Sequence, residues 1–375
     1  MTLSLSQIKE SFPQKAFFRG LAVVGALYLL IFVWLFLQGD NTRRTIEASL
    51  PSQTAVIKGG RPQLALAPYG QDHPGTEAHE SPSPAIGAHR DSSHSDQTAR
   101  TDHDLPAGDL AGLYEKTPEG LLPVIRAKDH MSVFEAFRTP FNPAMANGKP
   151  VISILIADLG LSAVATESAL RTMPPEIGFI LSPYADDLSL WASESRRRGH
   201  EIWLTLPMET TDYPRDDPGP FAALIGLPEQ ENIQRAARAM SRVQGYIGLA
   251  SPADASFMNE PDDVRPLLGN VFRRGLGFLD TSRAPAAQVA HIAEGMHAPY
   301  ATIDVPLDAQ ADKDSIRAAL AVLEQTARDK GQATGLIRPL PVSYHEILAW
   351  IQTLPAKGFV LAPLSTQAAG GLAHP

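Results

Sequence analysis

Acidic residues recur where apolar segments of this sequence end. Asp158 closes the near-continuous apolar segment 151–157, and Asp280, Asp304 and Asp308 lie at or near the ends of later segments. In α/β proteins, side chains at the carboxyl ends of parallel strands carry binding and catalytic chemistry. Carboxylates placed there can move a proton or ligate a divalent cation through oxygen. We therefore take Asp158 as the candidate catalytic residue.

The same residues also have a structural interpretation. Asp158 precedes the helical pattern LGLSAVATESAL, so its structural role would be that of a helix N-cap or a turn residue, and Asp280, before Thr281 and Ser282, can likewise cap the next helix. His200 follows three arginines and a glycine at an expected helix end, where an imidazole suits the helix dipole. We expect a structural role for His200, and for Asp158 both interpretations stay open.

The elements that must position these residues alternate along the chain. Strands are expected at 151–158, 176–182, 201–206, 246–250, 276–280, 301–305, 333–337 and 359–363, with amphipathic helices at 187–199, 231–243, 261–275 and 314–331. Strand–helix–strand repeats imply parallel pairing through right-handed crossovers. The sequence thus predicts an α/β domain, a (β/α) barrel of seven or eight parallel strands, with an open doubly wound sheet as the alternative. No glycine-rich phosphate motif follows any strand, which disfavours nucleotide binding.

One connection, from Met208 to Pro228, is unusually long and rich in proline and aspartate. Long ordered loops on α/β scaffolds commonly cover a binding face, and a flexible insertion is the alternative.

Composition excludes some kinds of site and partner. The 375 residues include no cysteine, which excludes disulfides, thiolate catalysis and cysteine-type metal sites. The net charge of -9 argues against nucleic acid as a partner, because phosphate binding needs a concentrated basic surface. An acidic cluster could hold a divalent metal weakly, but no D-x-[DN]-x-[DN]-G loop is present and no cofactor is predicted.

The N-terminal third differs from the rest. Residues 21–38 form an apolar segment long enough to cross a bilayer as a single transmembrane helix, after a short cytoplasmic tail at 1–20. A cleavable signal peptide is the rival, but no small-x-small site follows. Residues 39–112 read as a disordered linker rich in Pro, Ser and His, and its five histidines lack metal-ligand spacing. The folded domain is expected at 113–366, with a disordered tail at 367–375.

From Leu113 to Ser365 the sequence resembles the divergent polysaccharide deacetylase family, periplasmic relatives of carbohydrate esterases. The resemblance rests on seven pieces in order: LYEKTPEGLLPVI, VFEAFRTPF, ISILIADLG, GHEIWLTLPME with a following PGP, RRGLGFLDTSRAP, IDVPLD, and RPLP before HEILAW. It implies a domain in the periplasm, held to the bacterial inner membrane as a single-pass protein through residues 21–38, that acts on a glycan such as peptidoglycan.

The resemblance also implies a catalytic set that this sequence lacks. Family members use a metal on two histidines and an aspartate, with a second aspartate as base. Here Ala157 stands in the base position, Thr205 and Pro252 stand where ligands would lie, and Arg338 replaces a third histidine. Asp158 is the only motif ligand left.

Two classes of function follow. The domain is either an esterase with an altered site or a non-catalytic descendant that binds a glycan or a partner protein. Other residues expected in a strand-end cleft are Thr205, Glu209, Asp254, Asp280, Asp304, Asp308 and Arg338. We expect Arg338 to pair with Asp158 or Asp304 and so close an empty site, or else to bind an anionic sugar.

Overall fold

The computed structural model describes residues 111–282 and 287–368. Outside them lie the predicted cytoplasmic tail, the span, nearly all of the linker and most of the C-terminal tail, at 1–20, 21–38, 39–112 and 367–375. Within the described ranges, no helix combines the length and apolar character that a membrane crossing needs.

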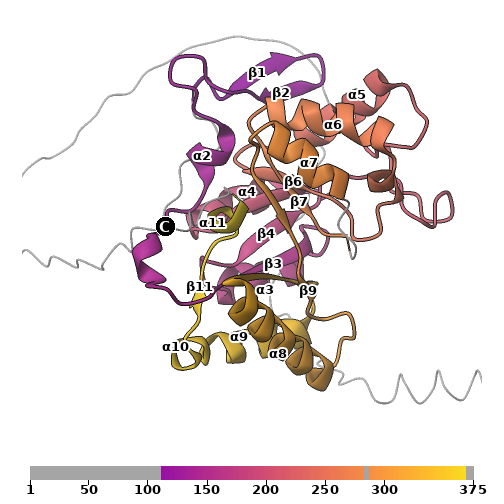
Figure 1. Cartoon of the computed structure of the whole chain (residues 1–375). Helices are drawn as coiled ribbons and strands as arrows, with labels where there is room; N and C mark the ends of the chain where they lie inside the picture. Colours follow the sequence, from indigo (N-terminus) through magenta and orange to yellow (C-terminus); the bar gives the residue numbers. More distant parts are fainter. Residues whose placement is uncertain (1–110, 283–286, 369–375) are drawn as a thin grey trace, which may run out of the picture. The chain divides into compact units, whose positions relative to one another are not determined.

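A parallel sheet forms the centre of the domain (Figure 1). Its order is β8-β7-β6-β5-β4-β3-β10-β9, and β11 pairs with the start of β3. The strands are β3 (Val151–Leu159), β4 (Gly178–Leu181), β5 (Ile202–Thr205), β6 (Gly248–Ala250), β7 (Gly277–Asp280), β8 (Tyr300–Thr302), β9 (Val305–Pro306), β10 (Gln332–Ile337) and β11 (Val360–Leu361). Most are buried on both faces, as parallel strands covered by helices must be.

The segment expected as one strand at 301–305 is divided into β8 and β9. Ile303 N–H donates to the Asp280 carbonyl at 3.2 Å, whereas Asp304 N–H donates to the Thr334 carbonyl at 2.9 Å. The chain therefore leaves β7 and joins β10 between these two residues. Because β8 and β9 are the two ends of the sheet order, the described sheet curves as a parallel half-barrel whose edges meet in one short segment. This pairing fits the predicted barrel better than an open doubly wound sheet.

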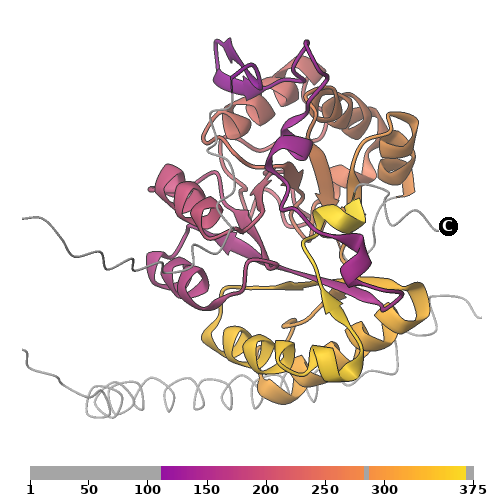
Figure 2. The same cartoon turned by 90° about the vertical axis from the view of Figure 1, so that its left-hand side faces the viewer.

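Helices surround the sheet on its outside (Figure 2). The four predicted helices are confirmed as α4 (Leu188–Arg197), α5 (Glu229–Met240), α6 (Pro261–Arg273) and α8 (Lys313–Lys330). The others in the described ranges are α2 (Val133–Phe137), α3 (Ala163–Thr172), α7 (Ala287–Gly295), α9 (Pro341–Ile351), α10 (Leu354–Lys357) and α11 (Ser365–Ala368), with two 3-10 turns, Pro143–Met145 and Ser256–Asn259. The ends of α8 follow local chemistry: Asp312 caps its first turn and Gly331, at φ 79°, ends it.

The core is built around Trp203 of β5, which is fully buried. Phe134 packs edge-on against it, with ring centroids 6.4 Å apart. Neighbouring β6 begins at Gly248, where an added Cβ would lie 2.4 Å from the Trp203 ring. Glycine is required at position 248 because the Trp203 indole occupies the space that any larger side chain would need.

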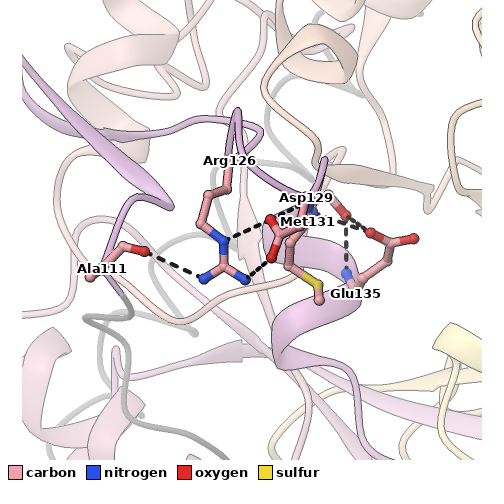
Figure 3. Close-up of polar contacts among 6 residues, drawn as sticks. Ala111, Arg126, Asp129, Met131 and Glu135 are labelled. Carbon is pink, nitrogen blue, oxygen red and sulfur yellow. Dashed lines mark hydrogen bonds and ion pairs between the residues drawn. The ribbon is translucent and has the colours of Figure 1, made fainter.

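The segment before the sheet, expected only as a short lead, is a hairpin of β1 (Tyr114–Thr117) and β2 (Gly120–Pro123) followed by α2. Figure 3 shows the turn between β2 and α2: Arg126 donates to both carboxylate oxygens of Asp129, at 2.8 and 2.7 Å, and to the Ala111 carbonyl at 3.4 Å. The guanidinium lowers the pKa of Asp129 to about 2. These contacts tie the first described residues to the domain.

Glu201, at the amino-terminal side of β5, joins both ends of the domain to the sheet. It accepts hydrogen bonds from Thr139 N–H at 2.8 Å and from Ser365 N–H at 3.1 Å, and the Ser365 hydroxyl also donates to it. Burial raises the pKa of its carboxyl group. Because α11 continues to the buried Ala368, the domain extends at least two residues beyond the predicted limit of 366.

Candidate functional site at the carboxyl ends of the strands

Asp158 lies at an irregular end of β3. The pairing of β3 with β4 shifts register between Ile156 and Leu159, and Asp158 itself has φ 55°. A left-handed backbone is uncommon outside glycine, and such positions and bulges often serve to aim a side chain. The Asp158 side chain is exposed. Ser162, rather than Asp158, accepts the capping hydrogen bond of α3, so the helix-cap interpretation of Asp158 is wrong.

Two opposing effects act on the pKa of Asp158. Partial removal of its carboxyl group from water raises its pKa, and the nearby Arg338 guanidinium opposes that rise. The strand register brings the two residues together, because Ile337 of β10 pairs with Ile156 of β3 just before each strand ends. Asp158 and Arg338 therefore face the same edge of the sheet as neighbours.

Arg338 is fixed by Asp308, a partner that the sequence does not predict. Of its two predicted partners, Asp158 interacts electrostatically with the guanidinium, whereas Asp304 pairs with Lys330. The Arg338 backbone N–H donates to Asp308 Oδ2 at 2.8 Å, and its Nε lies 3.5 Å from Asp308 Oδ1. Its Nη2 also donates to the Asp308 carbonyl. The Asp308 side chain is only 5% exposed, whereas that of Arg338 is 49% exposed. A buried carboxylate thus holds the base of a guanidinium that reaches into solvent.

A third residue completes this support. Ser343, in the first turn of α9, donates its hydroxyl to Asp308 Oδ2 at 2.6 Å. Sequence reasoning missed both Ser343 and the Asp308–Arg338 pair. The Asp308–Arg338 pair follows from the register of β9 on β10, in which Val305 pairs with Gly335 and Pro306 with Leu336. Two more residues along each strand bring position 308 beside position 338.

Asp304 does not join this group. Its carboxylate accepts from Lys330 Nζ at 2.7 Å and from Thr334 N–H at 2.9 Å. Lys330 ends α8 just before β10 begins, so the pair lies toward the amino-terminal side of that strand. Asp304 fixes the point at which the chain crosses to β10 and is not a residue of the predicted cleft.

Asp280 ends β7 and is fully buried. Its Oδ1 accepts from Ser282 N–H at 2.9 Å and from the Ser282 hydroxyl, and Tyr300 O–H lies 3.5 Å from its Oδ2. These contacts order the turn after β7, whereas the sequence predicts that Asp280 caps the next helix, α7, which begins at Ala287. Burial, and then the Asp280 charge, raise the pKa of Tyr300.

Two of the positions where the resemblance implies histidines, Thr205 and Pro252, lie at or just after the ends of β5 and β6. Thr205, half-buried, ends β5 beside Ala250 of β6. Ser251, next to Pro252, is buried; its hydroxyl accepts from Thr281 N–H at 3.0 Å and its carbonyl accepts from the Thr281 hydroxyl at 2.7 Å. These hydrogen bonds link the ends of β6 and β7.

Glu209 and Asp254 belong to the base of the 208–228 loop. Glu209 Oε2 accepts from Ile225 N–H at 3.0 Å, and the Asp254 carbonyl accepts from Thr211 N–H at 3.2 Å. The Asp254 side chain is exposed. The structure thus gives Glu209 a role in loop anchoring.

The 208–228 loop is itself tied down at several points. Tyr184 O–H donates to the Pro218 carbonyl at 2.8 Å, accepts from Phe221 N–H at 3.1 Å, and its ring stacks on Phe221 with centroids 5.1 Å apart. Asn232 of α5 accepts from Leu224 N–H and donates to the Leu224 carbonyl, both at 2.9 Å. The loop is an ordered part of the domain, against the flexible-insertion alternative.

A catalytic metal of the kind that the resemblance implies does not fit these residues. Across 111–282 and 287–368, no group of three or more His, Cys, Asp or Glu side chains is arranged to hold a metal ion. Asp158, the remaining motif ligand, has a guanidinium beside it where a second ligand would be needed. A fixed positive charge disfavours binding of a cation there.

His200 has a structural role, as the sequence predicts, but through burial as a neutral ring rather than as a partly positive group at the helix dipole. Its ring stacks on Phe179 with centroids 3.9 Å apart, and its Nδ1 lies 2.9 Å from the Ile177 carbonyl. It is 1% exposed, and burial lowers its pKa to about 4.

A cavity of about 700 Å³ lies away from these residues. Its lining includes Gly275, two residues before β7, and Pro299, immediately before β8, together with Phe134, His297 and Ala368. It therefore opens at the amino-terminal side of the sheet, opposite to Asp158 and Arg338.

The fold and site define a parallel β/α half-barrel protein whose candidate site lies at the carboxyl ends of its strands. More specifically, the chain belongs to the divergent polysaccharide deacetylase family, whose model matches residues 154–368. No curated protein matches the chain.

Solved structures extend this comparison. An uncharacterized protein from Agrobacterium tumefaciens is 31% identical, with a TM-score of 0.63 over 66% of this chain and 99% of that one. The catalytic domain of a peptidoglycan N-acetylglucosamine deacetylase from Eubacterium rectale is 14% identical, with a TM-score of 0.37 over 60% of this chain and 90% of that one. A mutant CE4 family pseudoenzyme with restored activity is 11% identical, with a TM-score of 0.34 over 59% and 68%. The last two are too distant to inform function.

Proposed function

We propose that this chain is a membrane-anchored envelope protein whose domain binds a glycan through Asp158 and Arg338 and does not perform metal-dependent deacetylation. One observation carries the proposal: Arg338 replaces an expected histidine and is held by Asp308 beside the exposed Asp158. The family match over residues 154–368 supports a carbohydrate ligand.

Asp158 and Arg338 together suit ligand binding better than hydrolysis. A carboxylate accepts hydrogen bonds from sugar hydroxyls, and a guanidinium donates to sugar oxygens, so the two groups together match a polyol. Hydrolysis would need an activated water, and the position next to Asp158 is Ala157, which cannot take a proton. We therefore assign Asp158 and Arg338 to ligand binding.

Deacetylation without a metal is the second candidate. It is favoured by the raised pKa of Asp158 and by its left-handed backbone, both of which are frequent at catalytic positions. Under this alternative, Asp158 would act as an acid or base on a glycan.

The anchor and location belong to the same proposal. The apolar segment 21–38 supports attachment to a bacterial inner membrane, with the domain in the periplasm, where a glycan of the cell envelope would be the partner. Fusion of a periplasm-dependent reporter to the C-terminus would test this topology, and a signal only from a cytoplasmic reporter would contradict it.

Binding and turnover can be measured on the same sample. We expect full-length protein to bind neutral oligosaccharides by calorimetry, to lose that binding on Asp158→Ala, and to release no acetate from N-acetylated oligosaccharides. Acetate release that Asp158→Ala abolishes would favour the second candidate. Absence of binding to every glycan would contradict both.

A further inference from the structure

The charges around Arg338 restrict the kind of glycan that its site can take. Arg338 carries one positive charge; its Nε lies 3.5 Å from the buried Asp308 carboxylate, and its Nη2 donates to the Asp308 backbone carbonyl. The guanidinium is thus already compensated before any ligand arrives. Asp158, exposed at the end of β3, adds a carboxylate on the neighbouring strand, because Ile156 of β3 pairs with Ile337 of β10 just before both strands end. An anionic sugar would therefore meet carboxylates on both sides of Arg338, which disfavours its binding.

Hydrogen-bonding capacity nonetheless remains on both side chains. Among the described residues, Arg338 Nη1 has no hydrogen-bond partner, and the side chain is 49% exposed. The Asp158 carboxylate likewise accepts no hydrogen bond from those residues and is exposed. A donor and an acceptor are therefore available side by side at the end of β10 and β3.

The Arg338 turn is stiff, so this pair is prepared before binding. Pro339 and Pro341 flank Leu340, whose N–H donates back to the Arg338 carbonyl at 2.8 Å. The Arg338 N–H is held by Asp308, which Ser343 holds in turn. Proline restricts the backbone, and a side chain fixed at its base loses less entropy when it binds.

We infer that the site recognises a neutral saccharide through two adjacent hydroxyl groups, one donating to Asp158 and the other accepting from Arg338. This inference rests on the proposed glycan-binding function and names the ligand class within it. A vicinal diol presents a donor and an acceptor at neighbouring carbons and carries no charge. Arg338 acts here as a directed donor, and its charge serves mainly to balance Asp308.

Calorimetry with full-length protein tests the inference. The neutral probes are cellotetraose and mannotetraose, which carry 2,3-diols. Their 2,3-di-O-methyl derivatives and a tetramer of glucuronic acid are the comparisons. We expect the neutral tetramers to bind, and each comparison to bind about tenfold or more weakly, since it loses a hydrogen bond to a charged group or adds an opposing charge.

Variants separate geometry from charge. Arg338→Lys keeps the positive charge without the planar fork, so it should weaken the neutral tetramers about tenfold. Arg317→Gln is the matched control, because Arg317 is also an exposed arginine, 60% exposed, paired with a buried carboxylate, Glu346, but on α8. It should leave binding unchanged.

Two kinds of result separate recognition of a vicinal diol from glycan binding in general. Glucuronic acid binding as tightly as the neutral tetramers, or full affinity in Arg338→Lys, would overturn the diol inference and leave glycan binding intact. Failure of every saccharide to bind would overturn both.

Discussion

At the residue scale, Asp308 emerges as the centre of the site, although the sequence draws attention to Asp158. It receives hydrogen bonds from Arg338 N–H and the Ser343 hydroxyl and pairs with the Arg338 guanidinium. A buried carboxylate with several donors is costly to leave unmatched, so its removal and the removal of its partner should have different consequences.

We expect Arg338→Ala to lower the free energy of unfolding by about 1 kcal/mol, because this ion pair is half exposed and two donors to Asp308 remain. Asp308→Ala should cost about 2–3 kcal/mol, since it leaves Arg338 N–H and the Ser343 hydroxyl unpaired inside the protein. Urea unfolding of both variants measures the difference. A larger loss for Arg338→Ala than for Asp308→Ala would contradict this order.

His200 makes a separate prediction about pH. Burial lowers its pKa from 6.5 to about 4, so the folded protein keeps the neutral imidazole while the unfolded chain takes up a proton. The stabilisation from His200 is complete above pH 6.5 and is lost as the pH falls toward 4, by about 3 kcal/mol. His200→Phe should keep the stack on Phe179 and reduce this decline. An equal slope of unfolding free energy against pH in both proteins would show that His200 is not responsible.

At the element scale, the 208–228 loop depends on α5. Asn232, 2% exposed, satisfies both backbone groups of Leu224. We expect Asn232→Ala to lower the free energy of unfolding by about 2 kcal/mol and to speed proteolysis within the loop, because both groups lose their partner. Asn270→Ala on α6 is the control, since within 111–282 and 287–368 the Asn270 side chain bonds only to the Arg274 side chain, from which it accepts at 3.2 Å. Similar cleavage rates in the two variants would refute the anchoring role.

The strands could be predicted from the sequence because their apolar runs are short, continuous and separated by amphipathic helices. Seven of the eight expected segments became single strands, but the one at 301–305 was divided. No local pattern marks that division, since it depends on whether β7 or β10 supplies the next hydrogen-bond partner. The 114–123 hairpin was likewise missed, although Pro118 and Glu119 between its strands form a short turn.

The site was only partly predictable for a related reason. Asp158 and Arg338 end their strands, and strand ends can be read from the sequence. Asp304 also borders a strand but lies toward the other end of the sheet, bonded to Lys330. Distinguishing such residues requires the stagger of neighbouring strands, which arises from pairing across the fold and leaves no mark in a single segment.

At the scale of the whole molecule, the C-terminal segment is part of the domain. Ser365 N–H and its hydroxyl bind Glu201, and Ala368 is buried. We expect a chain of residues 111–368 to unfold cooperatively and a chain of residues 111–364 to be less stable by several kcal/mol, because a buried carboxylate loses two of its donors. Thermal melts that coincide for both chains would contradict this account. Aggregation of the longer chain would refute a domain boundary near residue 111.

We propose that the strand-end site of this domain, with Arg338 beside Asp158, binds a ligand without a catalytic metal. Zinc content of the full-length protein after gel filtration tests it most directly. Because Asp158 stands beside a guanidinium and without imidazole partners, we predict far less than one zinc per chain, with no difference between wild type and Asp158→Ala. One zinc per wild-type chain, lost in Asp158→Ala, would contradict the claim.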